Sequence, residues 1–291
     1  MTDPTAPATD YAAFWGNGIY KCTNAGANTP TWSKLAGGLP SANATPPGGF
    51  LRVVLGLSPT SPQTLFALFA NNMTNAPNPA NNYVIDKLYQ TTNGGTSWSQ
   101  IALPSGSIGG QGFYNIDVNV DPTTPDIVYL GGVSLWKATR STVTGTWTVV
   151  DIGGGIHPDN HALAFDPTNH LVVYAGNDGG IYKSIDGGAT WFDGINEGLC
   201  ITQFEFIAQH PTSDAVVFGG TQDNGTEQFR NSPVFNHADD GDGGFCLVDQ
   251  SQPRNVISTY YGNSPKPSTI GGAFGSWNQV WNGITGATFQ F

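Results

Sequence analysis

The sequence predicts an all-β protein built from a repeated unit, and three observations support this prediction. Residues 184–191, Ser-Ile-Asp-Gly-Gly-Ala-Thr-Trp, return almost unchanged at 91–98 as Thr-Thr-Asn-Gly-Gly-Thr-Ser-Trp. Self-similarity with a period of about 40–50 residues is typical of propellers and solenoids. The 291 residues include 39 Gly and 20 Pro but only 11% charged residues, and no window places apolar residues at helical spacing. Such a composition suits short strands joined by tight turns.

Each repeat reads as four short strands, named A to D. Strand A ends in an Asp-Pro or His-Pro turn, and strand B follows a turn rich in Thr, Ser and Pro, as at 127–130. Strand C, as at 181–184, leads into the Gly-Gly turn, and strand D begins at the Trp. These turn residues fit their places because Pro fixes φ, Gly adopts positive φ, and Asp or Asn hydrogen-bonds its own backbone. The strands A that end in such turns are 113–122, 162–167 and 203–211.

The two ends of the chain complete one repeat between them. The N-terminal repeat has strands B, C and D only, whereas residues 286–291 read as a strand A with nothing after it. Residues 2–5, Thr-Asp-Pro-Thr, are the turn expected after such a strand. We therefore predict one domain, 1–291, that is a six-bladed β-propeller of four-stranded antiparallel blades, closed by the C-terminal strand completing the N-terminal blade. The predicted blades are 11–36 plus 286–291, 50–101, 113–150, 161–195, 203–237 and 243–281.

Charge and hydropathy exclude several partners. With 21 acidic residues against 10 Lys plus Arg, the net charge is −11, which disfavours nucleic acid and anionic membrane surfaces. The longest apolar runs, such as 50–57, are strand-sized and too short to cross a membrane. Residues 1–10 lack the charged and apolar regions of a signal peptide, yet the surface chemistry is that of an extracellular or cell-surface protein. Cys22, Cys200 and Cys246 fit neither a disulfide framework nor a zinc site, so we expect buried free thiols.

The repeated turn resembles the Asp-box (BNR) repeat, Ser/Thr-x-Asp-x-Gly-x-Thr/Ser-Trp. Over nearly its whole length the chain is similar to the propellers of sialidases, xyloglucan-cleaving glycoside hydrolases, sortilin-type receptors and a photosystem assembly factor. The two copies quoted above match closely, and Phe235 stands where blade five would carry a Trp. Because one fold hosts many functions, the resemblance specifies the fold and not the activity. The degenerate copies lie at 22–32, 139–147 and 268–277.

The resemblance implies a structural role for the boxes. Asp186 and Asn93 would hydrogen-bond the backbone of their own turns, and Trp98 and Trp191 would pack between strands. An acid in a box is therefore a poor catalytic candidate. Calcium binding by a box would need more oxygen ligands than one turn supplies.

By resemblance to propellers generally, the D–A and B–C connections surround the mouth of the central channel, opposite the boxes. Most polar and acidic residues in these connections belong to blades four to six. Sites form where such groups converge in a concavity, so we predict that this mouth binds a ligand. The predicted ligand-binding residues are Tyr114, His157, Asp159, His161, Asp178, Gln222, Asp223 and Asn224.

One segment of this mouth has two interpretations. Alternation along an extended chain would place His157, Asp159 and His161 on one side, where they could act as metal ligands or as an acid–base pair. Alternatively, His161 is a hydrogen-bonded residue that lines the channel, and the other two form a turn.

A second cluster, Asp239, Asp240 and Asp242, also has two interpretations. It could be a calcium site or supply a catalytic carboxylate, or its residues could be solvated and cap glycine turns. No Lys or Arg lies between Arg230 and Arg254 to offset repulsion among the three carboxylates, which favours a cation. Calcium is the one cofactor that the sequence suggests.

Three functions remain open. A sialidase is disfavoured because it needs an arginine cluster for the substrate carboxylate, and the four arginines show no triad. Glycoside hydrolysis by an Asp pair in the mouth is compatible with the sequence, although the xyloglucan enzymes use two propellers. Aromatic residues near the mouth favour binding of sugars or peptides. We expect non-catalytic recognition of a glycan or an extracellular protein, by a monomer or a domain of a larger chain. The alternatives are a glycoside hydrolase-like enzyme and a purely structural repeat domain of a surface protein.

Overall fold

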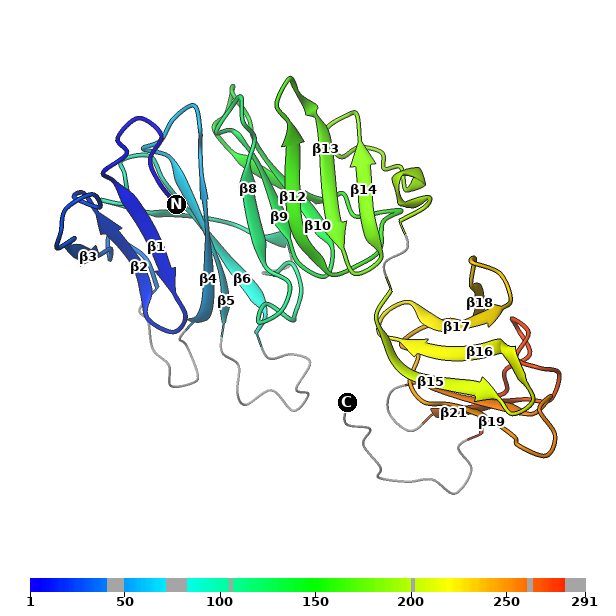
Figure 1. The fold of residues 1–291 in the computed structure, drawn as a ribbon. Helices are drawn as coiled ribbons and strands as arrows, with labels where there is room; N and C mark the ends of the chain where they lie inside the picture. The colour runs from blue at the N-terminus through cyan, green and yellow to red at the C-terminus, as the bar shows by residue number, and fades with distance from the viewer. Residues whose placement is uncertain (41–49, 72–82, 105–106, 200–201, 261–263, 281–291) are drawn as a thin grey trace. The chain divides into compact units, whose positions relative to one another are not determined.

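A computed structural model of the chain describes residues 1–40, 50–71, 83–104, 107–199, 202–260 and 264–280. These residues form six antiparallel sheets, three with four strands and three with three, and each sheet is built from consecutive strands (Figure 1). They include a short 3-10 helix, Gly194–Asn196, and no helix in the described part of the chain is long and apolar enough to cross a membrane. The contacts divide the chain into two compact units, 1–197 and 198–291.

Unit 1 contains four sheets. Their strands are β1 (Asp10–Phe14), β2 (Gly18–Cys22) and β3 (Trp32–Lys34); β4 (Phe50–Leu57), β5 (Leu65–Asn71), β6 (Ile85–Thr91) and β7 (Ser99–Ile101); β8 (Asp117–Val120), β9 (Ile127–Gly131), β10 (Leu135–Arg140) and β11 (Trp147–Asp151); and β12 (Asn160–Asp166), β13 (Asn169–Asn177) and β14 (Gly180–Ser184).

The core of unit 1 lies between successive sheets, and β5 shows why. Its first six residues are all buried, as expected for a strand covered on both faces. Because side chains alternate along a strand, Phe66 and Leu68 belong to one core cluster, together with residues of β8 and β9. Leu65 and Phe69 belong to another, together with residues of β1 and β2. Each interior sheet is therefore packed against the sheet before it and the sheet after it.

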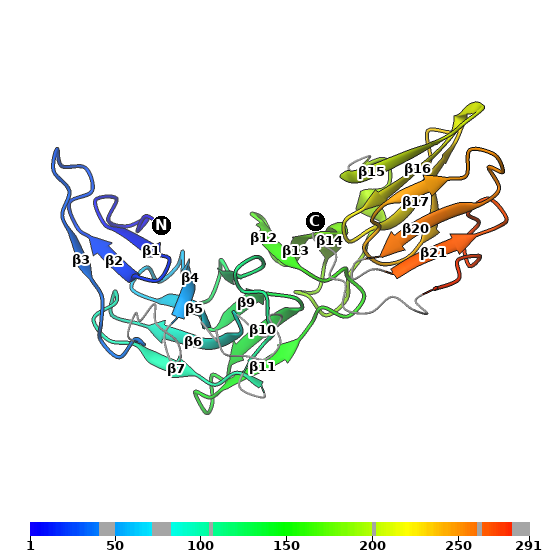
Figure 2. The ribbon, with the colours of Figure 1, turned by 90° about the horizontal axis from the view of Figure 1, so that it is seen from below.

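Unit 2 contains two sheets that pack side by side (Figure 2). Its core includes Phe218, Cys246 and Val256. The thiols of Cys22 and Cys246 are buried and form no disulfide, as predicted, and burial raises the pKa of Cys246 to about 12; Cys200 lies outside the described residues. The strands are β15 (Phe204–His210), β16 (Ser213–Thr221), β17 (Gly225–Arg230) and β18 (Asn236–Asp239), followed by β19 (Cys246–Val248), β20 (Val256–Tyr260) and β21 (Ser264–Ser268).

The predicted repeat is observed with local differences. The strand A expected at 113–122 begins only at Asp117, because Tyr114 N and Asn115 N both donate to Gln111 O and form a turn. The fourth sheet has three strands among the described residues, and Phe192 contributes a single bridge to Lys183 where a fourth strand was predicted. The expected strand at 286–291 lies outside the described residues.

Residues 2–5 form the turn that the sequence predicts after a strand A. Asp3 Oδ1 accepts hydrogen bonds from Thr5 N (2.8 Å) and Thr5 Oγ1 (2.7 Å). Asp121, after β8, binds Thr123 N and Oγ1 at the same two distances. Thr2 forms a bridge with Asp10 at the start of β1. Met1 and Thr2 thus pair with the start of β1, in the place where the end of a strand A is expected.

The Gly-Gly turns are closed by their own side chains, as predicted. Asp186 Oδ1 accepts a hydrogen bond from Thr190 N, and Asn93 Oδ1 accepts one from Ser97 N, both at 2.9 Å. The two glycines of each turn have positive φ, 69° and 89° for Gly187 and Gly188, where a side chain would be strained. Trp191 follows the second turn and donates its indole N–H to Ile152 O (2.8 Å), directly after the last strand of the preceding sheet. The side chains of Asp186 and Asn93 therefore stabilise their own turns, and Trp191 links its turn to the end of the preceding sheet.

Candidate functional site

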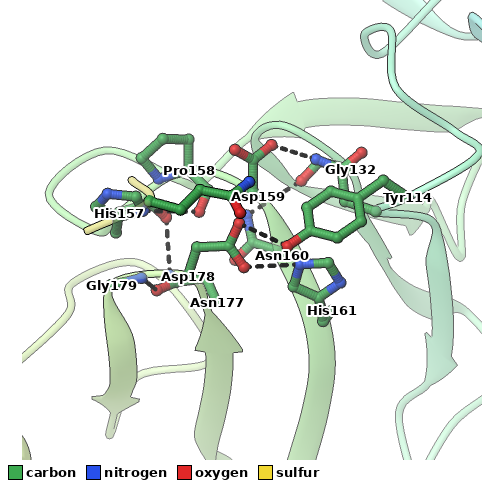
Figure 3. A network of polar contacts seen from close by, with 12 residues as sticks. Tyr114, Gly132, His157, Pro158, Asp159, Asn160, His161, Asn177, Asp178 and Gly179 are labelled. Atoms are coloured by element: carbon green, nitrogen blue, oxygen red, sulfur yellow. Dashed lines mark hydrogen bonds and ion pairs between the residues drawn. The ribbon is translucent and has the colours of Figure 1, made fainter. Parts of the chain in front are cut away.

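The candidate site lies in unit 1, where the turn before β8, the start of β12 and the β13–β14 turn meet (Figure 3). Asp178 is at its centre. Its Oδ2 accepts a hydrogen bond from the Tyr114 hydroxyl (3.0 Å), and its Oδ1 lies 2.9 Å from His161 Nε2. The rings of Tyr114 and His161 meet edge to face, with centroids 4.5 Å apart. A phenol and an imidazole therefore fix the orientation of this carboxylate.

The backbone around Asp178 and Asp159 is anchored to neighbouring turns. Asn177 Nδ2 donates to His157 O (2.7 Å), which joins the β13–β14 turn to the segment before β12. Asp159 N donates to Val133 O (2.9 Å) in the turn after β9. Asp159 itself has φ 63°, a left-handed conformation that residues other than glycine adopt at a cost and that recurs at functional sites.

The surroundings of Asp159 disfavour the charged form of its carboxyl group. Burial raises the pKa of its carboxyl group, and the negative charge of Asp178 raises it further. One carboxylate oxygen of Asp159 lies within 4.8 Å of one carboxylate oxygen of Asp178. Asn115, which is fully buried, donates a hydrogen bond to Asp159 Oδ1. Burial and the neighbouring like charge therefore both favour the protonated form of Asp159.

Aromatic side chains extend from Asp178 across the surface. Tyr83 and Phe113 have ring centroids 5.0 Å apart, and Phe113 and Tyr114 have centroids 6.4 Å apart. We call Tyr83, Phe113, Tyr114 and His161 the aromatic row. Phe113 and Tyr114 are 48% and 41% exposed, respectively. The row thus presents two adjacent rings to solvent beside a carboxylate.

Arg52, in β4, hydrogen-bonds the backbone of the turn that carries Phe113 and Tyr114. Its Nη1 donates to Phe113 O (2.7 Å) and Tyr114 O (2.9 Å). Burial lowers the pKa of this guanidinium, and the nearby Asp117 partly offsets the effect. Burial in turn raises the pKa of Asp117, which Asn119 and the Val118 N–H stabilise in its charged form. The turn that carries the exposed rings is therefore held by a partly buried group of charged residues.

The structure brings together four of the predicted site residues, namely Tyr114, Asp159, His161 and Asp178. His157 lies beside them, with its Nδ1 3.1 Å from Pro158 O. The alternation expected for 157–161 is wrong, because the left-handed Asp159 interrupts the extended chain. Among the described residues, His157, Asp159 and His161 do not form a set of converging metal ligands. The hydrogen-bonded alternative for His161 is the one observed.

The other predicted site residues belong to unit 2. Gln222, Asp223 and Asn224 form the turn between β16 and β17, in which Asn224 Nδ2 donates to Gln222 O (3.2 Å). Asp223 N donates to Asp242 Oδ1 (3.0 Å), which ties this turn to the following acidic loop. Whether these residues share a ligand with the site of unit 1 stays a prediction.

The three acids predicted to bind calcium turn to different partners. Asp239 forms an ion pair with Lys266 (2.7 Å) and Asp240 contacts His237 (2.8 Å). Asp242 accepts the backbone hydrogen bond described above, and the three carboxylates do not converge as a ligand set within the described part of the chain. Lys266 comes from β21, far along the sequence, so the local scarcity of Lys and Arg was misleading. These contacts favour the interpretation of these residues as a hydrogen-bonded loop over their interpretation as a calcium site. Calcium binding stays a prediction.

Sequence reasoning missed the residues that support the site. Arg52, Tyr83, Phe113 and Asn115 belong to no motif, and their spacing gives no signal. Two of them, Tyr83 and Phe113, reach the site from turns rather than from strands. Only the three-dimensional packing of β4 against β8 places Arg52 beneath the turn that precedes β8.

No protein-family model matches the chain, and no curated protein matches it either. Among solved structures, a GH74 enzyme from Niastella koreensis is similar, with 18% identity and a TM-score of 0.50, covering 96% of this chain and 44% of that one. A GH74 xyloglucanase from Xanthomonas campestris is 17% identical with a TM-score of 0.48, and the match covers 97% of this chain and 44% of that one. YCF48 from Cyanidioschyzon merolae is 12% identical with a TM-score of 0.42, and the match covers 99% of this chain and 85% of that one.

The chain spans less than half the length of these GH74 structures. At such identities the likeness to the Niastella koreensis enzyme concerns the fold alone. It supports a β-propeller fold for a chain whose described residues form six antiparallel sheets.

Proposed function

We propose that the chain recognises a glycan, without catalysis, through the aromatic row and Asp178. The observation that carries this proposal is the pair of exposed adjacent rings, Phe113 and Tyr114, ending at an oriented carboxylate. Aromatic faces pack on the C–H groups of sugar rings. Carboxylates form strong hydrogen bonds with donors such as sugar hydroxyls. The row and Asp178 together offer both kinds of contact on a surface held rigid by Arg52.

The charge of the site favours a neutral glycan. Asp159 and Asp178 lie close together, Asp117 is a third acid nearby, and the whole chain carries a net charge of −11. An anionic ligand would be repelled, whereas a neutral polyhydroxylated ligand is not. A secreted or cell-surface location, and a monomer or a domain of a larger chain, are part of this proposal. An extracellular protein partner remains the second class of ligand for the same surface.

Screening the purified chain on an array of neutral oligosaccharides, followed by calorimetry with the best ligand, tests the proposal. Because exposed aromatic anchors dominate such interfaces, Tyr114→Ala and Phe113→Ala should each weaken binding by about tenfold or more. The matched control is Phe274→Ala, which removes a ring of comparable exposure (63%) from unit 2. Unchanged affinity in both aromatic-row variants, or binding to protein partners alone, would exclude glycan recognition by this row.

A glycoside hydrolase-like activity is the second candidate, favoured by the Asp159–Asp178 pair. Glycosidases use two carboxyl groups, about 5–5.5 Å apart in retaining enzymes, and the general acid has a raised pKa. Asp159 meets the second condition, and its oxygens approach Asp178 within 4.8 Å. Release of reducing ends from a bound oligosaccharide, abolished by Asp159→Asn, would establish catalysis. Binding without any release of reducing ends would establish recognition alone.

We also propose that the repeats form a six-bladed Asp-box ring in which residues 286–291 complete the sheet of β1–β3. The turn formed by Asp3 and the bridge from Thr2 to Asp10 support the proposal, because the same turn comes directly after the strand A formed by β8. Deleting 286–291 should then lower the melting temperature, since β1 would become an open edge. An equal melting temperature for the truncated and full chains would exclude this closure.

A further inference from the structure

A cavity of about 470 Å³ lies in unit 2 between the ends of its two sheets. We propose that it binds the oxyanion group, carboxylate or phosphate, of a small ligand with an apolar body. This site is separate from the glycan surface and has the opposite charge. Its lining includes Arg230, Arg254, His210 and Thr212 on the polar side, and Phe218 and Ile270 on the apolar side.

The two arginines are positioned by the same turn. Arg230 Nη2 donates to Gly271 O (2.9 Å), and its Nε donates to Gln228 Oε1. Arg254 O accepts a hydrogen bond from Gly271 N (2.8 Å). The Gly271 peptide therefore fixes one guanidinium directly and the backbone of the other arginine.

Hydrogen-bonding capacity remains in this cavity. The Arg254 guanidinium has no hydrogen bond or ion pair with any residue in the described part of the chain, and Arg230 Nη1 has none there either. A guanidinium presents five donors, and paired N–H groups match the two oxygens of a carboxylate or phosphate. His210 Nδ1 accepts a hydrogen bond from Thr212 N (3.3 Å), so the proton of a neutral ring lies on the distal Nε2. The cavity thus offers further donors.

The surroundings favour an anion because none of the described residues that line the cavity is acidic. The chain has only 10 Lys plus Arg against 21 acids, yet two of its four arginines meet here. A local positive site in an acidic molecule focuses its field on a ligand group that the rest of the surface repels. The volume exceeds that of a lone ion, and Phe218 and Ile270 provide an apolar wall. An anionic group attached to an apolar body fits both features.

The test is calorimetric or NMR titration of the full chain with inorganic phosphate and, separately, with benzoate, at constant ionic strength set by chloride. Saturable binding of benzoate but not of phosphate identifies a carboxylate site, and the reverse identifies a phosphate site. Benzyl alcohol, which keeps the apolar ring and lacks the anion, should bind at least about tenfold more weakly than benzoate.

Variants assign the binding to the cavity. Arg254→Gln should weaken binding of the preferred probe by about tenfold or more, because a charge-assisted hydrogen bond is lost. Arg140→Gln, which alters an exposed arginine in unit 1, is the matched control and should bind normally. Arg230→Gln should act like Arg254→Gln; if it fails to fold because the Gly271 turn loses its support, Arg254→Gln still decides. Binding of neither probe, or equal binding by Arg254→Gln and the native chain, would overturn the proposal.

Discussion

Asp186 and Asp159, both in unit 1, differ in their surroundings and in the direction in which those surroundings shift the pKa of the carboxyl group. Asp186, in a Gly-Gly turn, is surrounded by donors from its own turn, namely Ser184 Oγ, Thr190 N and Thr190 Oγ1. Those hydrogen bonds lower its pKa to about 2. Asp159, at the other end of the strands, is partly buried beside Asp178, and its pKa is raised.

The difference distinguishes an acid that stabilises the fold from an acid that is a candidate for binding or catalysis. A carboxylate stabilised by its own backbone is satisfied and contributes to the fold. A carboxylate that is desolvated next to a like charge carries an energetic cost, and such costs recur at sites of binding or catalysis. Substitutions that remove hydrogen bonds or packing at the turns should therefore lower stability, and substitutions at the site should change binding.

The largest expected effect is on stability at a turn. Trp98 follows the first Gly-Gly turn, is only 6% exposed and belongs to the core cluster between the first two sheets. Trp98→Ala should lower the free energy of unfolding by about 3–5 kcal/mol, because it leaves a large cavity. Denaturant unfolding measures this loss, and Phe113→Ala, at the half-exposed aromatic row, is the control that should cost far less. Comparable losses for the two variants would contradict the proposed division of roles.

A smaller effect, of opposite sign, is expected at the site. A raised folded-state pKa means that native Asp159 binds more protons than unfolded Asp159 at pH values between 3.8 and the folded value. Stability due to this group is therefore highest below pH 3.8 and falls as the pH rises through that window. Asp159→Asn removes the charge, retains an oxygen to accept the Asn115 hydrogen bond, and tolerates positive φ.

Asp159→Asn should therefore be more stable than the native chain near neutral pH, by less than about 1 kcal/mol because the group is only partly buried and its charge is screened by solvent. Below pH 3.8 the two proteins should be equally stable. Chemical unfolding at both pH values, combined with the glycan titration, makes the measurement. If the variant were less stable than the native chain at neutral pH, the surroundings would stabilise the charged form of Asp159, which contradicts the expected electrostatic cost.

The sequence predicted the strands and turns well because their determinants are local. The Asp-Pro turn at Asp121 and the Gly-Gly turn at Asp186 consist of residues within four positions of one another. The apolar run of β5 likewise predicts burial on both faces. Tyr114, Asp159, His161 and Asp178 were predicted because they occupy connections at one end of the strands.

The remaining parts of the site depend on contacts between distant segments. Arg52 reaches the turn of Phe113 from a strand about sixty residues earlier, at separations of 61 and 62. Asp239 finds its counter-charge in Lys266, at a separation of 27. The left-handed Asp159 could not be predicted from alternation, since its conformation depends on hydrogen bonds to the turn after β9. Such partners have no periodicity that a single sequence reveals.

The smallest expected effect uses the comparison between the two closely matching turns. Asn93 occupies in one turn the place that Asp186 has in the other, and its Nδ2 donates to Ser97 Oγ (2.8 Å). In the second turn the hydroxyl of Thr190 donates instead to Asp186 Oδ2 (2.6 Å). An amide at position 186 can therefore be accommodated by rotating one hydroxyl group.

Asp186→Asn should thus leave the melting temperature near neutral pH almost unchanged and alter only the acid response. Because the folded-state pKa of Asp186 is lowered to about 2, its contribution to stability is present above pH 3.8 and is lost as the pH falls toward about 2. The variant has no such group, so its melting temperature should fall less steeply over that range. Asp186→Ala, which removes the hydrogen bonds as well as the charge, is the matched comparison and should melt lower at every pH. If Asp186→Asn were as destabilised as Asp186→Ala at neutral pH, the charge itself would be essential, and the equivalence of the two turns would fail.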